Sequence, residues 1–165
     1  STQGVSSAAS DVYKRQENGE GVRFESRKGA PVVNMVFDPQ CQWCVWEFEQ
    51  FRPFMDRVTF VWHPVAVLNP WSELQGAAIL AAKDPKATFM EHEKHFRDEA
   101  FKGLDVRKMT LPFEKREKVW DNSKIFRRAG GNSVPFGVLK TTDGRYVPIP
   151  QVTTADFARL SGLKA

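Results

Sequence analysis

A nearly continuous apolar run over residues 31–37 constrains the fold of this chain more than any other feature. Such a run suits a central strand that is buried on both faces of a sheet. Residues 38–40, Asp-Pro-Gln, end the run, and two cysteines follow directly, Cys41 and Cys44. The sequence therefore places a Cys-x-x-Cys motif at the end of a buried strand.

The residues after the motif predict a helix and a second strand. Apolar residues recur at helical spacing over residues 41–55, and Pro53 is expected to kink or end that helix. Residues 58–67 are again apolar and predict the next strand, and the alternating segment 22–25 predicts a short one. Strand, helix and strand in this order form the unit that builds parallel sheets.

Residues 72–129 predict a helical block that follows this unit. Ser72 and Asp84 are expected to cap two of its helices, the second running toward Phe101, and a third is expected over residues 113–129. Two apolar segments then flank Asp143 and Gly144, which predicts a β-hairpin, and residues 154–163 suit a closing helix. We expect an α/β fold with a central mixed sheet, flanking helices and a helical insertion.

The first 21 residues are rich in Ser, Gly, Gln and charged side chains and show no clear apolar periodicity. We expect a disordered tail there and one domain over residues 22–165. Residues 4–16 resemble peptides that arise when sequencing-adapter DNA is translated at the front of a gene, which indicates a non-native start. No secretory signal pattern is visible, so we expect a signal peptide to have been removed or lost with the natural N-terminus.

Charge and hydropathy exclude two broad classes. The 24 basic and 20 acidic residues give a net charge of +4, but they are mostly intermixed, whereas nucleic-acid-binding proteins usually concentrate positive charge in a patch. The densest basic pairs, Arg107-Lys108 and Arg127-Arg128, are expected to be solvated. No apolar run approaches the roughly 18 residues that would span a bilayer. We expect neither a nucleic-acid partner nor a transmembrane segment.

The Cys-x-x-Cys motif carries the chemistry. A cysteine at a strand-to-helix junction lies over the free amides of the helix N-terminus, which favour the thiolate over the thiol. Cys41 is therefore the expected nucleophile, and Cys44, one turn into the helix, is the expected resolving cysteine. This chemistry needs no cofactor other than the redox-active Cys41–Cys44 disulfide.

Three other interpretations of the motif stay open: a structural disulfide, half of a zinc site and two inert thiols. A bridge that closes so short a loop gains little chain entropy. Zinc would need two more ligands, and the paired candidates His92 and His95 lie far downstream rather than at finger spacing. We expect both to be ordinary exposed histidines, His63 to be structural, and the chain to hold no metal.

The motifs resemble those of a known family. Residues 32–44 and the later Ser133-Val134-Pro135 are similar to the thioredoxin superfamily. The Asp-Pro-x-Cys-x-x-Cys arrangement, Arg52-Pro53 and residues 77–85 resemble the DsbG branch of the bacterial periplasmic DsbC and DsbG proteins, over roughly residues 30–163. The resemblance implies a thioredoxin-like fold, a periplasmic location and exchange of disulfides with other proteins.

The same resemblance implies roles for single residues. Pro135 would be a cis-proline facing the cysteines, and Val134 would pair with an extended substrate peptide, to which Trp43 is an expected third contact. The alternative is that Pro135 merely begins an edge strand. DsbC and DsbG typically have Thr before this proline, whereas Val134 is more like DsbA. Oxidase, isomerase and sulfenic acid reductase activities therefore all remain open.

The partners implied by the resemblance are proteins with cysteines or disulfides, and a membrane thiol reductase as electron donor. A homodimer is expected if an N-terminal domain is missing. The alternative function is a thioredoxin-fold chaperone or assembly factor without redox turnover, which would hold peptide in a cleft near Trp43, Val134 and Phe136.

Overall fold

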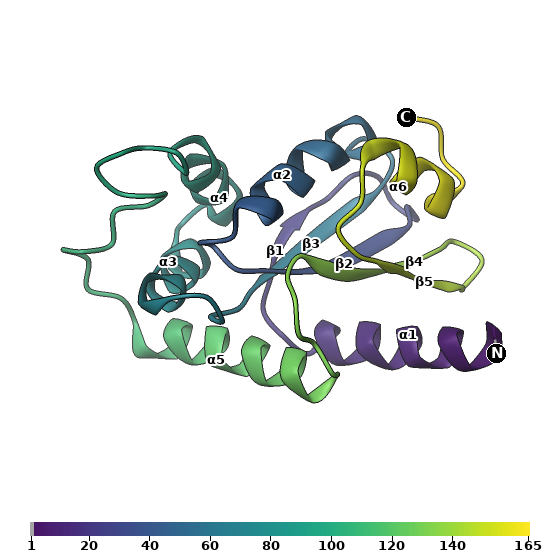
Figure 1. The fold of residues 1–165 in the computed structure, drawn as a ribbon, viewed down its shortest axis with the longest axis horizontal. Coiled ribbons are helices and arrows are strands. Elements are labelled where there is room, and N and C mark those ends of the chain that lie inside the picture. The colour runs from purple at the N-terminus through teal and green to yellow at the C-terminus, as the bar shows by residue number, and fades with distance from the viewer. Residues whose placement is uncertain (1) are drawn as a thin grey trace.

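The computed structural model describes residues 2–165 and is built around one five-stranded mixed sheet in the order β1-β3-β2-β4-β5 (Figure 1). Strands β2 and β3 are parallel, and the other neighbouring pairs are antiparallel. The expected mixed sheet is therefore confirmed. The strands are β1 (Val22–Phe24), β2 (Val32–Phe37), β3 (Thr59–Pro64), β4 (Phe136–Lys140) and β5 (Tyr146–Ile149).

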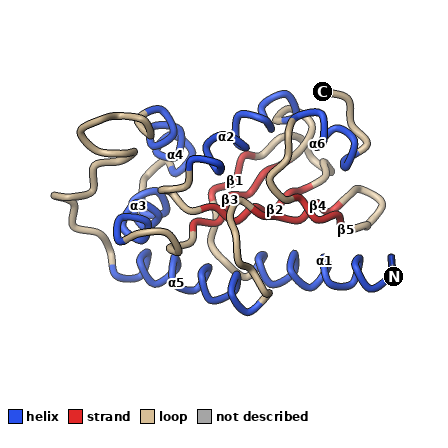
Figure 2. Tube along the Cα trace, viewed as in Figure 1, coloured by secondary structure: helices blue, strands red, loops and turns tan. Residues whose placement is uncertain are grey.

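Helices cover both faces of the sheet. Helices α2 and α6 lie on one face, α1 and α5 lie on the other, and α3 and α4 gather at one end (Figure 2). The elements are α1 (Thr2–Glu17), α2 (Gln42–Phe51), the 3-10 turn η1 (Arg52–Phe54), α3 (Pro70–Ala81), α4 (Pro85–Lys94), α5 (Phe113–Arg128) and α6 (Thr154–Ser161). Within the described residues, no helix combines the length and the apolar character needed to cross a membrane.

An aromatic core holds α2 against the sheet. The rings of Phe51 and Phe60 stack with their centres 4.7 Å apart, and Phe48 lies 5.8 Å from Trp62. Phe157 of α6 closes the same cluster at 4.9 Å from Phe51. Because each buried aromatic ring removes a large apolar area from water, this cluster fixes the position of α2. It thereby fixes the motif at the N-terminus of that helix.

Helices α3, α4 and α5 form the expected insertion between β3 and β4, but two of their ends differ from the sequence-based prediction. Helix α3 begins at Pro70 with Asn69 as N-cap, and Ser72 is the third helical residue of a capping box rather than the cap. Helix α4 has the expected N-cap, Asp84, but it ends at Lys94. Residues 95–112 after it contain neither helix nor strand.

The N-terminal segment also differs from the expected tail, since residues 2–17 form α1. Ala9, Tyr13 and Gln16 recur at helical spacing and are buried, and the ring of Tyr13 lies 5.4 Å from that of Tyr146 in β5. The sequence interpretation missed this stripe because small and polar residues make up most of the segment. Ser1, which the predicted tail also included, lies outside the described residues.

Candidate functional site

Cys41 is the N-cap of α2, at the junction where the sequence predicted the nucleophile. Its Sγ accepts a hydrogen bond from the backbone N–H of Cys44 at 3.1 Å, and both cysteines are free thiols. The Cys44 thiol and the backbone N–H groups of Cys44 and Trp43 stabilise the thiolate and lower the pKa of Cys41, although burial opposes them. These contacts therefore favour the thiolate form of the sulfur at the helix end.

Cys44 lies one turn into α2 and has the opposite preference. Its side chain is 3% exposed, and burial is the main cause that raises its pKa well above the ordinary value. The neighbouring Cys41 sulfur raises the pKa further. Cys44 therefore holds its proton more firmly than Cys41, which is the difference predicted between a resolving and an attacking thiol.

The predicted proline loop faces Cys41, the predicted nucleophile. The Val134–Pro135 peptide bond is cis, and the carbonyl oxygen of Val134 lies 3.8 Å from Cys41 Sγ. Pro135 precedes β4 rather than beginning it. Trp43 is 48% exposed and lies in the same groove. This groove has a volume of about 570 Å³ and is lined by Gln40, Cys41, Gln42, Trp43, Leu68, Lys102, Asn132, Ser133 and Val134.

Asp38 anchors the turn that carries Cys41, a role that the sequence analysis did not predict. The side chain is fully buried and accepts hydrogen bonds from the backbone N–H groups of Gln40, Val67 and Leu68 at 2.8, 2.8 and 3.0 Å. The backbone carbonyl of Asp38 also accepts from Cys41 N at 2.9 Å. One carboxylate thus ties the motif to the segment that leaves β3.

His92 holds the same turn from the other side, and the expectation that it would be exposed is wrong. The ring is 1% exposed. Its Nε2 donates to the carbonyl of Pro39 at 2.6 Å, while its Nδ1 accepts from Leu104 N at 3.1 Å. Burial lowers the pKa of His92 to about 4, so the ring is neutral. It bridges α4, the motif turn and the 95–112 loop.

Two glutamines complete this connection. Gln75 of α3 donates to the carbonyls of Lys102 and Leu104 at 2.8 and 3.0 Å. Gln40 donates to Gln75 Oε1 at 2.6 Å and accepts from the side chain of Asn69 at 3.1 Å. The insertion therefore contacts the motif through paired polar groups. These groups are distant in sequence, and for that reason no local pattern identified them.

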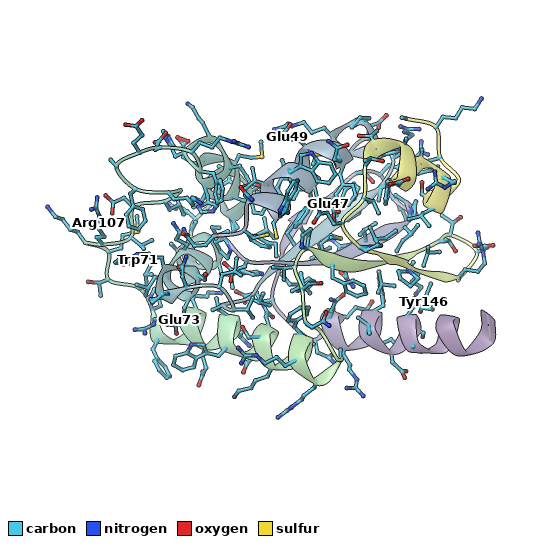
Figure 3. All side chains as sticks on the ribbon, viewed as in Figure 1. Glu47, Glu49, Trp71, Glu73, Arg107 and Tyr146 are labelled. Atoms are coloured by element: carbon cyan, nitrogen blue, oxygen red, sulfur yellow. The ribbon has the colours of Figure 1, made fainter. Side chains whose placement is uncertain are left out.

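Glu47 is a second buried group that the sequence analysis missed. Glu47 and Glu49 lie on different sides of α2, with Glu47 toward the protein interior and Glu49 toward solvent (Figure 3). Glu47 Oε2 accepts from Val152 N at 2.6 Å, whereas its Oε1 has no hydrogen-bond partner among the described residues. Burial, assisted by the nearby Cys41, raises the pKa of Glu47 to about 9.

The two histidines considered as zinc ligands both have other partners. Both ring nitrogens of His92 are engaged in hydrogen bonds, and His95 lies on the half-exposed end of α4 with its Nδ1 2.6 Å from Asp98. Within residues 2–165, no three His, Cys, Asp or Glu side chains are arranged to hold a metal ion.

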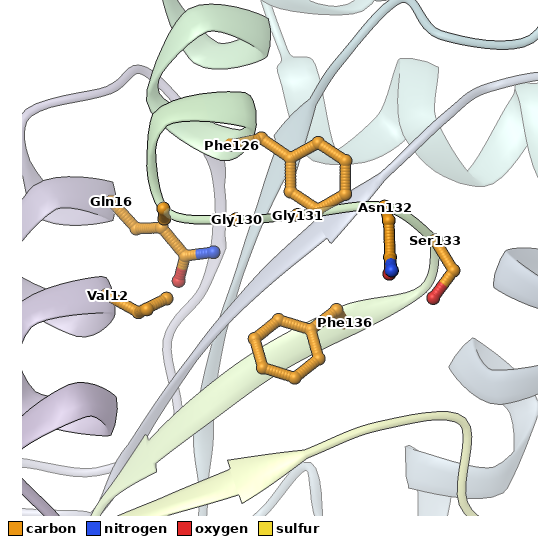
Figure 4. Close-up of a pocket in the computed structure, with 9 residues that line it drawn as sticks. Val12, Gln16, Phe126, Gly130, Gly131, Asn132, Ser133 and Phe136 are labelled. Atoms are coloured by element: carbon orange, nitrogen blue, oxygen red, sulfur yellow. The ribbon is translucent and has the colours of Figure 1, made fainter.

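A separate cavity of about 120 Å³ lies behind the proline loop, between α1 and the segment after α5 (Figure 4). Its apolar walls include Val12, Phe126 and Phe136. Asn132 and Ser133 line both this cavity and the groove beside Cys41. The cavity contains neither cysteine, so the motif groove remains the candidate site.

No family model matches the chain. In sequence it is similar to two proteins named thiol:disulfide interchange protein DsbG. The Escherichia coli K12 protein is 32% identical over 135 residues, which are 78% of this chain and 51% of the relative. The Pseudomonas aeruginosa PAO1 protein is 27% identical over 140 residues, which are 83% of this chain and 53% of the relative. The chain thus spans about half the length of each.

In structure the chain is similar to a periplasmic thioredoxin-like protein from Salmonella enterica serovar Typhimurium. The TM-score is 0.71 at 14% identity, and the match covers 92% of this chain and 94% of the other. The expected thioredoxin-like fold is confirmed by this likeness. The expected resemblance to DsbG is confirmed by the sequence similarity.

Proposed function

From the similarity of this chain to DsbG proteins and from its thioredoxin-like fold, we propose that it is a thiol-disulfide oxidoreductase acting on cysteines of other proteins. The observation that carries the proposal is the unequal pair of sulfurs. Cys41 has a lowered pKa at the edge of an open groove, while Cys44 beneath it has a raised pKa. A lowered pKa gives more of the attacking thiolate, so this difference supports Cys41 for the first attack and Cys44 for resolution.

The reaction proceeds in two exchanges. The Cys41 thiolate attacks one sulfur of a substrate disulfide, forms a mixed disulfide and releases the second substrate sulfur as a thiolate, which takes up a proton. Cys44 then loses its proton and attacks Cys41 Sγ. This step forms the Cys41–Cys44 disulfide and releases the first substrate sulfur. The substrate gains two electrons, the protein loses two, and the same steps run in reverse oxidise a dithiol.

Substrate binding in this proposal uses the walls of the groove. The backbone of Val134 faces the nucleophile and is available to an extended peptide, Pro135 shapes that loop, and the exposed ring of Trp43 offers apolar contact. Proteins with cysteines or disulfides are therefore the substrates. Oxidation, isomerisation and reduction of sulfenic acids all use this geometry, and the reduction potential of the pair selects among them.

The similarity to DsbG proteins and to a periplasmic thioredoxin-like protein supports a periplasmic location for this chain, which we propose. We also propose a membrane thiol reductase as electron donor when the protein reduces or isomerises. The chain spans about half the length of these relatives, and a homodimer is proposed only for the case that an N-terminal domain is missing.

The proposal is tested with two single substitutions. Cys41→Ser should reduce the turnover of a disulfide-bonded protein substrate to the uncatalysed rate. Cys44→Ser should accumulate mixed disulfides that are visible on non-reducing gels. Turnover retained by the Cys41→Ser variant would contradict the assignment. Suppression of aggregation by both variants without any disulfide exchange in the wild type would instead support the chaperone alternative.

A further inference from the structure

The groove beside Cys41 is uneven in charge. Among the described residues that line it, Lys102 is the one with a permanently charged side chain. The other residues around the sulfur are amides, Ser133 and apolar groups, including the exposed Trp43 and Leu68, which are 48% and 52% exposed. A substrate segment in this groove therefore meets one cation and no anionic side chain other than the thiolate itself.

The backbone of Lys102 is held beside the motif by two glutamine side chains. Its carbonyl oxygen accepts hydrogen bonds from Gln75 Nε2 at 2.8 Å and from Gln40 Nε2 at 3.1 Å, and Gln40 directly precedes Cys41. The adjoining Gly103 has a φ of +80° and packs against His92, where a Cβ would clash with the imidazole ring. The loop cannot move away from Cys41 without breaking these contacts.

The ammonium group of Lys102 is positioned by the ring of Phe96. Nζ lies 4.8 Å from the ring centre of Phe96, a residue that is 3% exposed, and this contact is a cation–π interaction. Two of the three carboxylates in the 95–112 loop form ion pairs with other residues. Asp98 pairs with His95 at 2.6 Å, and Asp105 pairs with Arg107 at 2.7 Å. None of the ion pairs among the described residues includes Lys102. Its charge is therefore available to a ligand.

We propose that Lys102 is a specificity-determining residue, which selects protein segments that carry a carboxylate a few residues from the reactive cysteine. The inference rests on the proposed function of the same groove. A carboxylate on the Lys102 side pairs with the ammonium, whereas the wall formed by Asn132, Ser133 and Val134 offers no charge. The preference should therefore depend on which side of the cysteine the acidic residue occupies.

The test measures how fast reduced wild-type protein attacks short peptides. Each peptide carries one cysteine that is joined by a disulfide to 2-thiopyridone. The Cys41 thiolate attacks the peptide sulfur, the peptide–thiopyridone bond breaks, and the leaving thiopyridone is followed by its absorbance. Glutamate, glutamine or lysine is placed in turn at each of the three positions before and after the cysteine.

Glutamate should accelerate the attack about 2- to 5-fold over glutamine on one side of the cysteine, as expected for a partly exposed ion pair. Lysine at the same positions should slow it, and high salt should remove the difference. Lys102→Glu should reverse the order of the peptides, and Lys102→Met should abolish it. Lys118→Glu, an exposed change of the same charge on α5, is the matched control and should keep the wild-type order.

Equal rates for the three peptides, or the same preference on both sides of the cysteine, would overturn the inference while leaving the proposed function intact. A preference unchanged in Lys102→Glu would do the same. Failure of every peptide to react faster with the protein than with free cysteine would instead overturn the proposed function, and the inference with it.

Discussion

Two buried ionisable groups, one on each side of the motif, differ in how fully their polar atoms are hydrogen-bonded. His92, on the side of the helical insertion, has a partner for each ring nitrogen. Glu47, on the side of α6, has one oxygen bonded to Val152 N and the other unpartnered in the described structure. Both lie close to the motif and both are neutral near pH 7, because burial lowers one pKa and raises the other.

This difference separates His92, which positions the site, from Glu47, which lowers the stability of the fold. A buried polar atom without a partner costs about 1–3 kcal/mol, whereas a paired one is close to neutral or favourable. His92 thus holds the turn before Cys41 with little loss of folding free energy. Glu47 destabilises the fold whenever the unfolded chain can ionise it, and substitutions at these positions should change stability in opposite directions.

The largest expected effect is that of Glu47→Gln. Between its ordinary pKa of 4.5 and the folded-state value of about 9, Glu47 holds a proton in the folded protein that the unfolded chain releases. Wild-type unfolding free energy should therefore fall by about 1.4 kcal/mol per pH unit from this group across that range. Glutamine keeps the acceptor for Val152 and removes the titration, so the variant should gain on the order of 3 kcal/mol at pH 7.

Urea unfolding at pH 5 and pH 8 measures this effect. The advantage of Glu47→Gln over the wild type should be larger at pH 8 by about 4 kcal/mol. Glu49→Gln, at an exposed position on the same helix, is the control and should change little at either pH. Parallel pH profiles for Glu47→Gln and the wild type would show that the buried carboxyl does not retain its proton.

The next effect should be a loss of stability in His92→Phe. Phenylalanine fills a similar volume but leaves the carbonyl of Pro39 and the N–H of Leu104 unpartnered, which should cost about 2–3 kcal/mol at pH 7. The wild-type protein loses stability as the pH falls from 6.5 toward about 4, the pKa of His92 in the folded state. In this range only the unfolded chain binds a proton at His92. The deficit of the variant should therefore shrink on acidification.

His95→Phe is the control substitution, because the imidazole of His95 is half-exposed and lies at the same end of α4 as His92. It should change the unfolding free energy by less than about 0.5 kcal/mol. Equal losses in the two variants would mean that His92 contributes by ring packing alone and does not hold the motif turn.

The smallest effect should come from Gln40→Ala, at about 1 kcal/mol. Gln40 connects Asn69, Gln75 and the carbonyl of Lys102, but it is only partly buried, so water can replace some of these hydrogen bonds. Gln42→Ala, at the exposed position between the cysteines, should be neutral to thermal and urea unfolding. A larger loss in Gln42→Ala than in Gln40→Ala would contradict the described network.

The sequence was sufficient for those features that local patterns specify. The apolar run over residues 31–37 became β2, the motif became the N-cap of α2, and Asp143-Gly144 became the hairpin turn. Each depends on neighbours within a few positions, where periodicity and turn chemistry are informative. Glu47 and His92 depend instead on partners 105 and 53 positions away, so their burial could not be anticipated.

The sequence analysis does not predict helix α1, for another reason. Its buried side chains include Ala9, Tyr13 and Gln16, and the small and polar members of this stripe do not count as apolar in a periodicity search. The sequence-based prediction extends α4 too far because residues 95–101 contain no proline or glycine. In the structure, the loop that follows α4 returns to contact His92 and Gln75. In both cases the packing of the whole molecule decided the outcome.

The buried position of Cys44 has a temporal consequence. Part of what raises its pKa is the neighbouring Cys41 sulfur, and in the mixed disulfide of the proposed reaction that contribution would disappear, while burial would remain. A thiol that prefers its proton reacts slowly. We therefore expect Cys44 to delay the release of a bound substrate chain, which gives that chain time to rearrange.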